Sequence, residues 1–452
     1  MKVLLSAYAC LPNAGTEPGN GWNWAIHLAE RDIDVHVLTV VEGRDRIEEY
    51  RRDHPNPRIQ FSYVRVPTKR FKECSGMHYA LWQWCAVKVA RALQKTERFD
   101  IAHHVTYGSI HVPSQLWRVG IPVVFGPVGG GQTAPPSMLR HFGAAERSER
   151  LRTMLTKALP YSPLHRMWLR KMSAILATNR DTLELIHSMG RADAKLQFDT
   201  ALPESFLAPR PRLFCDQSRP LRLLWVGTMH PRKALPLTLD ILANVRYPST
   251  LTIIGNGSGS ATLNEMIKER NLSERVIWTG KRLPWADVRE AYLEHDAMLF
   301  TSLRDSCACQ LLEAMALGLP VITLDLHGAR DLVPDGAGIK VPLSAPNEIV
   351  RDVAMAVDRY AKLSGSDRTK MSIVGWEFAR SMTWKSSGCR SRAAIPKSPF
   401  GSERNLATKQ WCRSYIRSGV GRSDVEVTDS SGIFFPRPNC KTQRCSGNSK
   451  CL

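Results

Sequence analysis

The strongest constraint on the fold is an alternation of short apolar runs with longer helix-like segments. In the first 200 residues, runs rich in β-branched and apolar side chains predict strands at 2–7, 35–40, 59–66, 101–104, 123–125 and 174–178. Between them, apolar residues at three- and four-residue spacing predict helices at 20–31, 77–94 and 109–118. Such alternation is typical of a parallel sheet with helices on both faces.

The same alternation begins again after a proline-rich segment. Residues 203–220 hold four prolines and no periodic pattern, so we predict that they form a linker. Beyond them we predict strands at 221–226, 250–254, 276–278, 297–301 and 321–323, and helices at 235–244, 261–269, 285–295 and 310–317. The sequence therefore predicts an α/β chain of two Rossmann-like domains, 1–202 and 221–385, that face each other across a cleft.

Residues 386–452 differ from the rest of the chain. They hold 12 Lys and Arg against 4 Asp and Glu, with many Ser and Gly residues and no sustained period. We predict an irregular, disordered tail. Its five cysteines lack the close pairing of a zinc site. We find neither a membrane-spanning run nor a secretory leader, so we expect a cytoplasmic protein.

The whole chain is strongly basic, with a formal net charge of +20. Such an excess favours a phosphate-bearing partner, which could be a nucleotide, a nucleic acid or an anionic membrane, or else it is surplus surface charge. Nucleic acid is the weakest of these, because the basic residues of the tail are scattered and few aromatic residues lie among them.

Glycines cluster in the loop that follows the first predicted strand. Gly15, Gly19 and Gly21 precede or enter a helix whose amino end we place near Asn20. Free amides at a helix start attract anions, and glycines permit a close approach of the backbone. The alternative is a flexible strand-to-helix turn.

The second half carries two further loops of this kind. Arg232 and Lys233 follow a strand and Gly227, and they could together hold a diphosphate at the mouth of the cleft, or they could be two solvated charges. Gly255 and Gly257 form a turn after the next strand. No acidic residue closes the strand predicted at 276–278, which argues against a dehydrogenase.

Two acidic residues lie eight positions apart around the start of a predicted helix. Asp305 lies in a loop after one strand, and Glu313 lies within the helix that follows. The helix start offers amides and a positive dipole to a phosphate, while the carboxylates can accept hydrogen bonds from sugar hydroxyls. Both acids could instead be helix-start charges, but Glu313 is too deep in the helix to cap it.

These motifs resemble a known family. Glu-Ala-Met-Ala-Leu-Gly-Leu-Pro-Val-Ile at 313–322, the acid eight positions earlier, and Gly-Thr-Glu-Pro-Gly-Asn-Gly-Trp at 15–22 look like the family-4 (group 1) retaining glycosyltransferases of GT-B fold. The resemblance runs over residues 1–385. It implies transfer of a hexose from a nucleotide diphosphate sugar to a hydroxyl of a polysaccharide or lipid-linked glycan, with retention of the anomeric configuration and without a metal or other cofactor.

The resemblance also implies roles for single residues. Glu313 would bind the ribose of the donor, Asp305 a hydroxyl of the transferred sugar, and Arg232 and Lys233 the diphosphate. The implied catalytic residues are Asp305, Glu313 and Lys233. The implied donor-binding residues are Arg232, Lys233, Gly227, Gly255, Gly257, Ser306, Cys307, Ala308 and Cys309. The implied acceptor or glycine-loop residues are Gly15, Thr16, Glu17, Gly19, Gly21, Gly129 and Gly130.

The chain departs from the family pattern at several places. The loop between the two acids reads Ser-Cys-Ala-Cys at 306–309, where the family has glycines, and Gly126 stands where many members have a histidine. His103 and His104 lie one strand earlier and either reach the cleft or belong to the core. The closing helix, which braces the first domain in the family, starts at 376–384 and then becomes irregular. A catalytically inactive protein that binds nucleotide sugars is therefore the second hypothesis.

Two further segments have the composition of binding sites. Residues 140–171 combine eight Lys and Arg with Met and Leu residues and a Trp. They are either a surface that lies on an anionic membrane, which would make the protein peripheral at the cell membrane, or an ordinary basic helical insertion. Asp32 and Asp34 form the Asp-x-Asp pattern of a metal site, but they lie at a helix-to-strand junction away from the expected cleft.

Overall fold

The protein is described by a computed structural model that covers residues 1–67, 75–216, 218–281 and 283–385. The predicted tail at 386–452 lies outside the described residues. The described chain forms two sheets in which every strand pairing is parallel. The predicted fold class, two Rossmann-like α/β halves, is confirmed.

The first sheet has the strand order β3-β2-β1-β4-β5-β6-β7. Its strands are β1 (Lys2–Ser6), β2 (Asp34–Val40), β3 (Ile59–Val64), β4 (Ile101–His104), β5 (Val123–Val128), β6 (Ala174–Ala177) and β7 (Lys195–Leu196). The helices of this first lobe are α1 (Thr16–Ala29), α2 (Arg44–Asp53), α3 (Gly76–Glu97), α4 (Glu146–Ala158), α5 (Pro163–Arg170) and α6 (Arg180–Ser188). Alternate residues of β1 face opposite layers: Val3 and Leu5 pack with α1 and α2, and Leu4 packs with α3 and α6.

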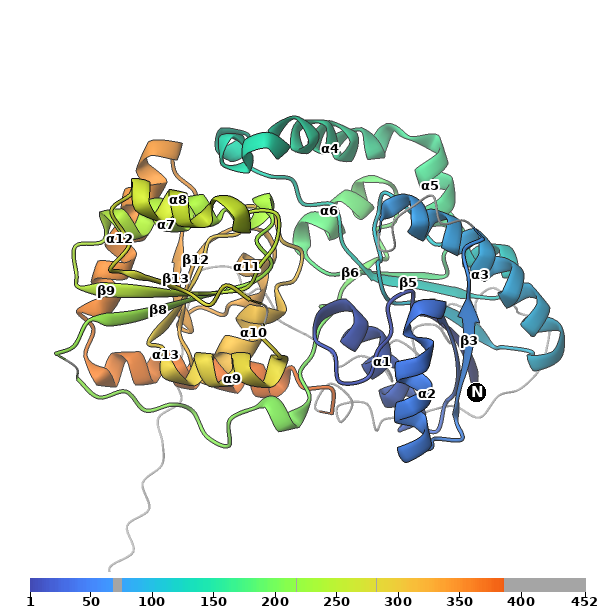
Figure 1. Cartoon of the computed structure of the whole chain (residues 1–452). Helices are drawn as coiled ribbons and strands as arrows, with labels where there is room; N and C mark the ends of the chain where they lie inside the picture. The colour runs from blue at the N-terminus through green and yellow to red at the C-terminus, as the bar shows by residue number, and fades with distance from the viewer. Residues whose placement is uncertain (68–74, 217, 282, 386–452) are drawn as a thin grey trace, which may run out of the picture. The chain divides into compact units, whose positions relative to one another are not determined.

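The second sheet has the strand order β10-β9-β8-β11-β12-β13. Its strands are β8 (Leu221–Val226), β9 (Ser249–Ile254), β10 (Val276–Trp278), β11 (Ala297–Phe300), β12 (Val321–Leu324) and β13 (Gly338–Val341). The helices of this second lobe are α7 (Leu235–Asn244), α8 (Ser260–Glu269), α9 (Trp285–Glu294), α10 (Cys309–Ala316), α11 (His327–Leu332) and α12 (Pro346–Ala361), followed by α13 (Gly365–Ser381). Figure 1 shows α7, α8 and α12 on one face of the sheet and α9, α10 and α13 on the other.

One predicted helix is absent. Residues 109–118 do not form a continuous helix: Ser109 makes bridge pairings with Val112 and Gly129, and a short 3₁₀ turn spans Leu116–Val119. Pro113 explains the difference, because proline lacks the N–H that a helix interior requires and its ring clashes with the preceding turn. The apolar spacing of this segment reflects an irregular strip of core rather than a helix face.

The glycine loop is shorter than predicted. α1 begins at Thr16 and not near Asn20, so Glu17, Gly19 and Gly21 lie on the helix. These glycines serve packing: a Cβ on Gly19 would lie 1.9 Å from the Ala14 carbonyl oxygen. A Cβ on Gly21 would lie 2.1 Å from the carbonyl oxygen of Ala9. The first turn of α1 therefore packs directly on the loop before it.

The predicted linker precedes the second lobe and the closing helix α13 ends it, and both segments make contacts that hold them to the described chain. Ala208 N–H donates to the Ala316 carbonyl over 3.0 Å, which ties the linker to the end of α10. After α13, Trp384 packs against Trp24 and His27 of α1, with ring centroids 5.9 and 5.5 Å apart. The chain therefore returns to the first lobe before it leaves the described residues. The boundaries at 202 and 221 remain a prediction.

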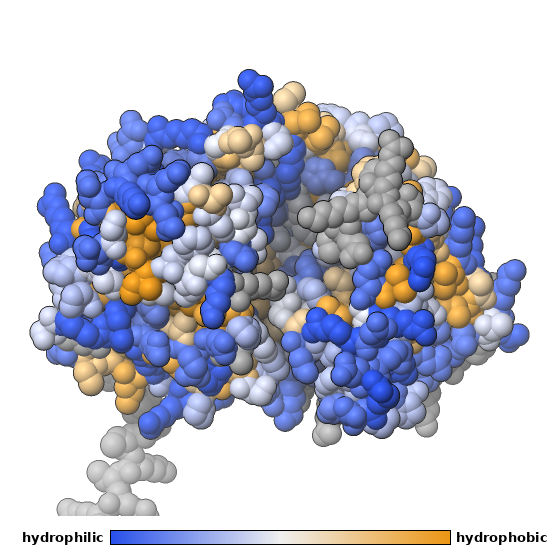
Figure 2. All heavy atoms as spheres, viewed as in Figure 1, coloured by the Kyte–Doolittle hydropathy of each residue, from blue (hydrophilic) through white to orange (hydrophobic). Residues whose placement is uncertain are grey.

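No helix in the ranges that the structure covers combines the length and the apolar character needed to cross a membrane. Hydrophilic side chains cover most of the face seen in Figure 2, with apolar groups gathered at a few places.

Candidate functional site

Two cations and one carboxylate form the centre of the candidate site. Arg232 and Lys233 lie in a 3₁₀ turn, Pro231–Lys233, directly after β8. Asp305 lies in the loop after β11, and its Oδ2 atom is 3.0 Å from the Arg232 Nη1 atom and forms an ion pair with Lys233 Nζ. β8 and β11 are neighbours in the sheet, so the two loops leave the same edge. The sequence-predicted residues Arg232, Lys233 and Asp305 are thus in direct contact.

The position of Lys233 is fixed by its surroundings. Its side chain is 5% exposed, and its ammonium lies 4.8 Å from the centre of the Phe300 ring. Ala234 has a left-handed backbone with φ of 49°, which ends the 3₁₀ turn and starts α7. The Lys233 stem passes within 4.0 Å of the place that a Cβ on Gly227 would occupy. This is an ordinary van der Waals distance, so the path of the lysine does not depend on a glycine at 227.

The charges in this cluster are stabilised by one another. Burial alone would raise the pKa of Asp305, but Lys233 and Arg232 hold it well below its ordinary value. Burial lowers the pKa of Lys233, and the attraction of Asp305 opposes that effect. The formal charges of Arg232, Lys233 and Asp305 sum to one positive charge.

Glu313 lies on the second turn of α10 and is 5% exposed. Its two carboxylate oxygens accept hydrogen bonds from Trp285 Nε1 over 2.8 Å and from the Tyr292 hydroxyl over 2.9 Å, both on α9. Burial raises the pKa of Glu313, and these hydrogen bonds act in the opposite direction. No side chain caps the amino end of α10, so its first amides are available to an anion.

The other glycines predicted for the donor side bring two loops together. Gly255 has φ of 140°, and a Cβ on it would lie 1.9 Å from the Gly227 carbonyl oxygen. Gly257 has φ of 155° and lies against the backbone of Met229. Both glycines are therefore required where the β9–α8 loop packs on the β8–α7 loop. Their described contacts are with this backbone.

Loops of the first lobe reach the donor-side residues at two points. A Cβ on Gly129 would lie 3.1 Å from the Ser306 Cβ atom, next to Asp305. A Cβ on Gly15 would lie 3.7 Å from the Trp285 ring, which binds Glu313. The predicted first-lobe residues Gly15 and Gly129 therefore approach the predicted second-lobe residues.

The remaining glycine-loop predictions have other surroundings. Glu17 accepts a hydrogen bond from the Tyr107 backbone N–H over 3.2 Å, and burial raises its pKa. The Gly130 carbonyl accepts hydrogen bonds from Arg152, over 2.9 Å, and its φ is 101°. Thr16 is exposed at the start of α1.

Sequence reasoning missed an ionic link between α4 and the loop after β11, which is predicted to bind the donor. Arg304 precedes Asp305, and its Nε atom lies 2.7 Å from Oε1 of Glu149, which is 4% exposed. Arg152, one turn further along α4, donates to the carbonyls of Gln132 and Gly130 over 2.9 Å each. The signal in the sequence was only the single charge at 304, and its partner lies 155 positions earlier.

Sequence reasoning also missed the residues that surround the Ser-Cys-Ala-Cys segment. Asn179, which caps α6, donates from Nδ2 to the Ser306 carbonyl over 3.1 Å. Asp199 interacts with Cys307, and the Thr200 hydroxyl lies 3.3 Å from Cys309 Sγ. Ala308 is buried and forms the amino-terminal boundary of α10.

Burial, followed by the nearby Glu17 carboxylate, raises the pKa of Asp199 to about 7. Burial likewise raises the pKa of both thiols, Cys307 and Cys309, well above their ordinary value. The two cysteines therefore fill space as neutral groups in the loop where the family has glycines.

The two histidines of β4 belong to the core and not to the candidate site. His103 lies 2.8 Å from the Gly126 carbonyl, and His104 bonds to the Ser6 and Tyr79 hydroxyls over 3.1 and 2.7 Å. Burial lowers their pKa values to about 4 and about 3. The alternative in which they reach a cleft is wrong, because both are fully buried in the sheet.

The structure contains no candidate metal cluster within its described ranges: no group of three His, Cys, Asp or Glu side chains comes together there. Asp32 and Asp34 are ion-paired with Arg58 at 3.1 and 3.0 Å. Their position at the α1–β2 junction agrees with the prediction that they lie apart from the site.

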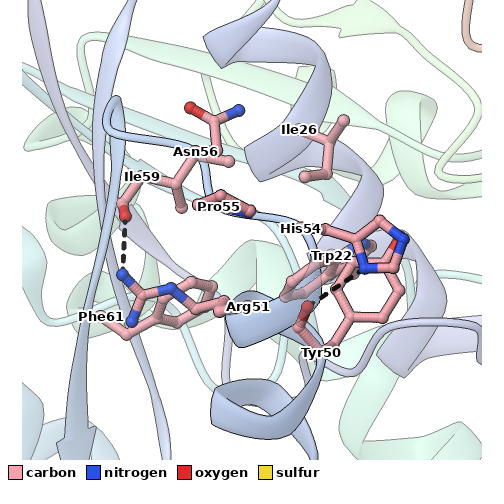
Figure 3. Close-up of a pocket in the computed structure, with 9 residues that line it drawn as sticks. All are labelled: Trp22, Ile26, Tyr50, Arg51, His54, Pro55, Asn56, Ile59 and Phe61. Carbon is pink, nitrogen blue, oxygen red and sulfur yellow. Dashed lines mark hydrogen bonds between the residues drawn. The ribbon is translucent and has the colours of Figure 1, made fainter.

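A cavity of about 220 Å³ lies elsewhere, between α1, α2 and β3 (Figure 3). Its lining shares no residue with the candidate site. The lining residues are Trp22, Ile26, Tyr50, Arg51, His54, Pro55, Asn56, Ile59 and Phe61. Polar atoms here bond to the chain itself: Arg51 donates to the Ile59 carbonyl over 3.4 Å, and His54 Nδ1 lies 3.2 Å from the Tyr50 carbonyl (Figure 3). The aromatic rings of Trp22, Tyr50 and Phe61 pack on one another.

Comparison with known proteins adds an independent observation. Residues 220–360, which include Arg232, Lys233, Asp305 and Glu313, match the family described as "Glycosyl transferases group 1". A GDP-mannose-dependent alpha-mannosyltransferase of Mycobacterium tuberculosis is 23% identical over 355 residues, which are 76% of this chain and 84% of that protein. A lipopolysaccharide 1,6-galactosyltransferase of Salmonella typhimurium is 29% identical over 148 residues, 32% of this chain. That match spans only 40% of the galactosyltransferase.

Solved structures agree on the fold. A sucrose-phosphate synthase from Thermosynechococcus elongatus superposes with a TM-score of 0.61 at 13% identity, over 92% of this chain and 99% of that one. Anabaena HepE, in complex with UDP and glucose, superposes with a TM-score of 0.54 at 15% identity, over 92% of this chain and 100% of that one. Residues 220–360 are therefore similar to the group 1 glycosyltransferases, and the two lobes of the chain have the GT-B fold.

Proposed function

We propose that this chain transfers a hexose from a nucleotide diphosphate sugar to a hydroxyl group of a polysaccharide or a lipid-linked glycan, with retention of configuration and without a metal ion. The observation that carries the proposal is the contact of Arg232 and Lys233 with Asp305 at the carboxyl edge of the second sheet. The match of residues 220–360 to this family supports transferase chemistry. The relatives and neighbours support the donor class, since the mycobacterial mannosyltransferase is GDP-mannose-dependent and Anabaena HepE is in complex with UDP and glucose.

Arg232 and Lys233 would bind the diphosphate. In the described structure they share one carboxylate, so they can take up further negative charge, and their side chains are already positioned by the 3₁₀ turn. The bond between C1 of the sugar and the diphosphate oxygen breaks during transfer, and negative charge develops on the leaving group. Fixed cations at that place stabilise the transition state without a reorganisation cost. The uncapped start of α10 would contribute amides to the same phosphates.

The two carboxylates would hold the sugars of the donor. Glu313 is buried among hydrogen-bond donors on α9 and would accept hydrogen bonds from the ribose hydroxyls. These bonds would either replace those from Trp285 and Tyr292 or add to them. Asp305 would accept from a hydroxyl of the transferred hexose once the diphosphate has engaged Lys233 and Arg232. Ser306, Cys307, Ala308 and Cys309 would line the donor between the two acids, with Gly227, Gly255 and Gly257 shaping the loops behind the diphosphate.

The first lobe would present the acceptor. Gly15 and Gly129 approach Trp285 and Ser306, so a hydroxyl bound along these loops would lie close to the donor. Glu17, Gly130 and the exposed Thr16 would border the acceptor, and Gly19 and Gly21 keep α1 packed on that loop. In a retaining transfer the acceptor oxygen bonds to C1 on the face that the diphosphate leaves, and the hydroxyl proton passes to the diphosphate or to solvent.

The proposal is tested by turnover of a panel of nucleotide diphosphate sugars. The full-length chain is incubated with each sugar and a glycan acceptor extract, and release of nucleoside diphosphate is followed. Proton NMR then reads the anomeric configuration of the new linkage. We expect diphosphate release with one donor and a linkage of the donor's configuration. Tight donor binding without release would instead support the inactive alternative, and an inverted linkage would contradict retention.

A further inference from the structure

The α4–α5 segment exposes large apolar side chains to solvent. Of the thirteen large apolar residues that are exposed in the described chain, six lie between positions 151 and 167. They are Leu151 (57% exposed), Met154 (68%), Leu155 (54%), Tyr161 (85%), Leu164 (48%) and Met167 (42%). On α4 they recur at helical spacing on one face, and this concentration is unusual for a surface that meets only water.

The charge of the same surface has one sign. No acidic residue occurs between Glu149 and Asp181. The exposed basic residues here are Arg150, which pairs with Glu146 over 2.6 Å, and five others: Arg147, Lys157, Arg166, Arg170 and Lys171. Among the ion pairs that the structure describes, none involves these five others. We define the exposed apolar and basic side chains of residues 147–171 as the docking surface.

We propose that this docking surface lies on an anionic phospholipid bilayer. Apolar side chains between unpaired cations are the pattern by which a helix binds in the interface of such a membrane: the apolar groups enter the acyl boundary and the cations face anionic headgroups. A second copy of this chain is a poorer partner, because a symmetric contact would bring two surfaces of the same positive sign together. Charge complementarity therefore favours the bilayer.

The opposite face of α4 connects this surface to the candidate site. Glu149 forms an ion pair with Arg304, next to Asp305, and Arg152 holds the carbonyl of Gly130. Thr156 lies 3.1 Å from His111 on the same side. A bilayer against α4 would thus lie one helix diameter from the donor-side loop, about 10 Å. The purpose of docking rests on the proposed function, because docking would bring a lipid-linked acceptor to the enzyme.

The test is co-sedimentation of the full-length chain with vesicles. Vesicles of phosphatidylcholine alone are compared with vesicles that also contain phosphatidylglycerol. The docking variant is Met154→Ser, Leu155→Ser and Met167→Ser. The matched control is Leu213→Ser, Ile277→Ser and Met355→Ser, which removes three apolar side chains of similar exposure (68, 59 and 59%) elsewhere. None of the six residues belongs to the proposed donor or acceptor machinery.

We expect binding to the anionic vesicles only, weakened by salt. The docking variant should bind at least about tenfold more weakly, since each buried CH₂ contributes about 0.8 kcal/mol, while the control stays within about twofold. Unchanged binding of the docking variant would overturn the proposal and assign binding to another basic segment, such as 386–452. Absence of binding by the unmodified chain would also overturn it. If the unmodified chain elutes as a dimer in size-exclusion chromatography and the docking variant elutes as a monomer, a second copy of the chain covers the surface and the proposal is overturned.

Two further readouts separate the possible failures. Donor turnover is measured without vesicles for both triple variants, and we expect the unmodified rate in each. Loss of vesicle binding with this rate intact would support docking independently of catalysis. If vesicle binding behaves as proposed while no donor is turned over, the docking stands and the proposed function fails. Circular dichroism checks folding, and exposed substitutions of this kind change stability by only about 0.5 kcal/mol.

Discussion

The buried contact of Lys233 with Asp305 gives the most detailed prediction. Lys233→Met keeps the length of the side chain and removes its charge. Removal of one partner of a buried ion pair costs about 3–5 kcal/mol when the other charge is left alone. Here Asp305 keeps Arg232 at 3.0 Å, so we expect a smaller loss, about 2 kcal/mol of the free energy of unfolding of the second lobe.

The effect on catalysis should be larger than the effect on folding. A preorganised donor at the developing charge is typically worth about 10²–10³ in kcat, and we expect a loss of this size in Lys233→Met. The double variant with Asp305→Asn should lose less stability than the sum of the two single variants, by about 1–2 kcal/mol, because the second change removes the charge that the first leaves exposed.

Two assays are used. Stability is measured by urea unfolding monitored by circular dichroism, and activity is measured by the release of nucleoside diphosphate. Lys340→Met is the control: its ammonium lies 2.6 Å from Asp335, whose side chain is 94% exposed, so the cost should stay below about 1 kcal/mol. The reasoning is refuted if Lys233→Met unfolds like Lys340→Met and transfers sugar at the unmodified rate, or if the losses of Lys233→Met and Asp305→Asn simply add.

Three further predictions concern the same site. Glu313→Gln should weaken donor binding by about tenfold or more, since hydrogen bonds to charged groups are worth about 1.5–3 kcal/mol; an unchanged KM for the donor would exclude its role at the ribose. Asp199 has a pKa raised to about 7, so from pH 4 to 7 the folded state keeps a proton that the unfolded state loses, and stability falls as pH rises, by at most about 1.4 kcal/mol per unit. Asp199→Asn should lack this decline in urea midpoints, and parallel curves for the two proteins would contradict the shift. A chelator such as EDTA should leave transfer unchanged, because Arg232 and Lys233 supply the positive charge; loss of activity restored by a divalent cation would disprove metal independence.

The second lobe could be predicted in detail from its sequence because its strands are short, uniformly apolar and separated by regular helices. The helix predicted at 235–244 has the bounds of α7, and the strand predicted at 221–226 has those of β8. Buried parallel strands give continuous apolar runs, and this pattern depends on neighbours in the sequence alone. The local contacts of Arg232, Lys233 and Asp305 followed from the same regularity, since each comes directly after a strand of one sheet.

Features that depend on distant contacts could not be predicted. The segment 109–118 has helical spacing, but Ser109 pairs with Gly129 and Pro113 interrupts the backbone. The glycines at 19 and 21 predict a loop that either binds an anion or forms a flexible turn, whereas in the structure they pack a helix on the carbonyls of Ala14 and Ala9. A glycine in the sequence does not reveal whether its missing Cβ makes room for a ligand or for the chain itself.

The partners of the loop after β11 could not be predicted either, because they lie far from it in the sequence. Arg304 contacts Glu149, and Asn179 contacts the Ser306 carbonyl, across 155 and 127 positions of sequence. A single polar residue carries no local sign of such a contact. His103 and His104 show the converse, because the sequence leaves open whether they reach the cleft or belong to the core, and the structure satisfies both within the core.

The central claim, that Arg232 and Lys233 hold a diphosphate, is tested most directly by calorimetric titration. UDP, GDP and ADP and their monophosphates are titrated into the unmodified chain and into Lys233→Met. The account predicts that one diphosphate binds at least about 100-fold more tightly than its monophosphate, since two charge-assisted contacts are involved, and that Lys233→Met removes most of this difference. Equal affinity for the diphosphate and the monophosphate, or a difference that survives in Lys233→Met, would contradict it.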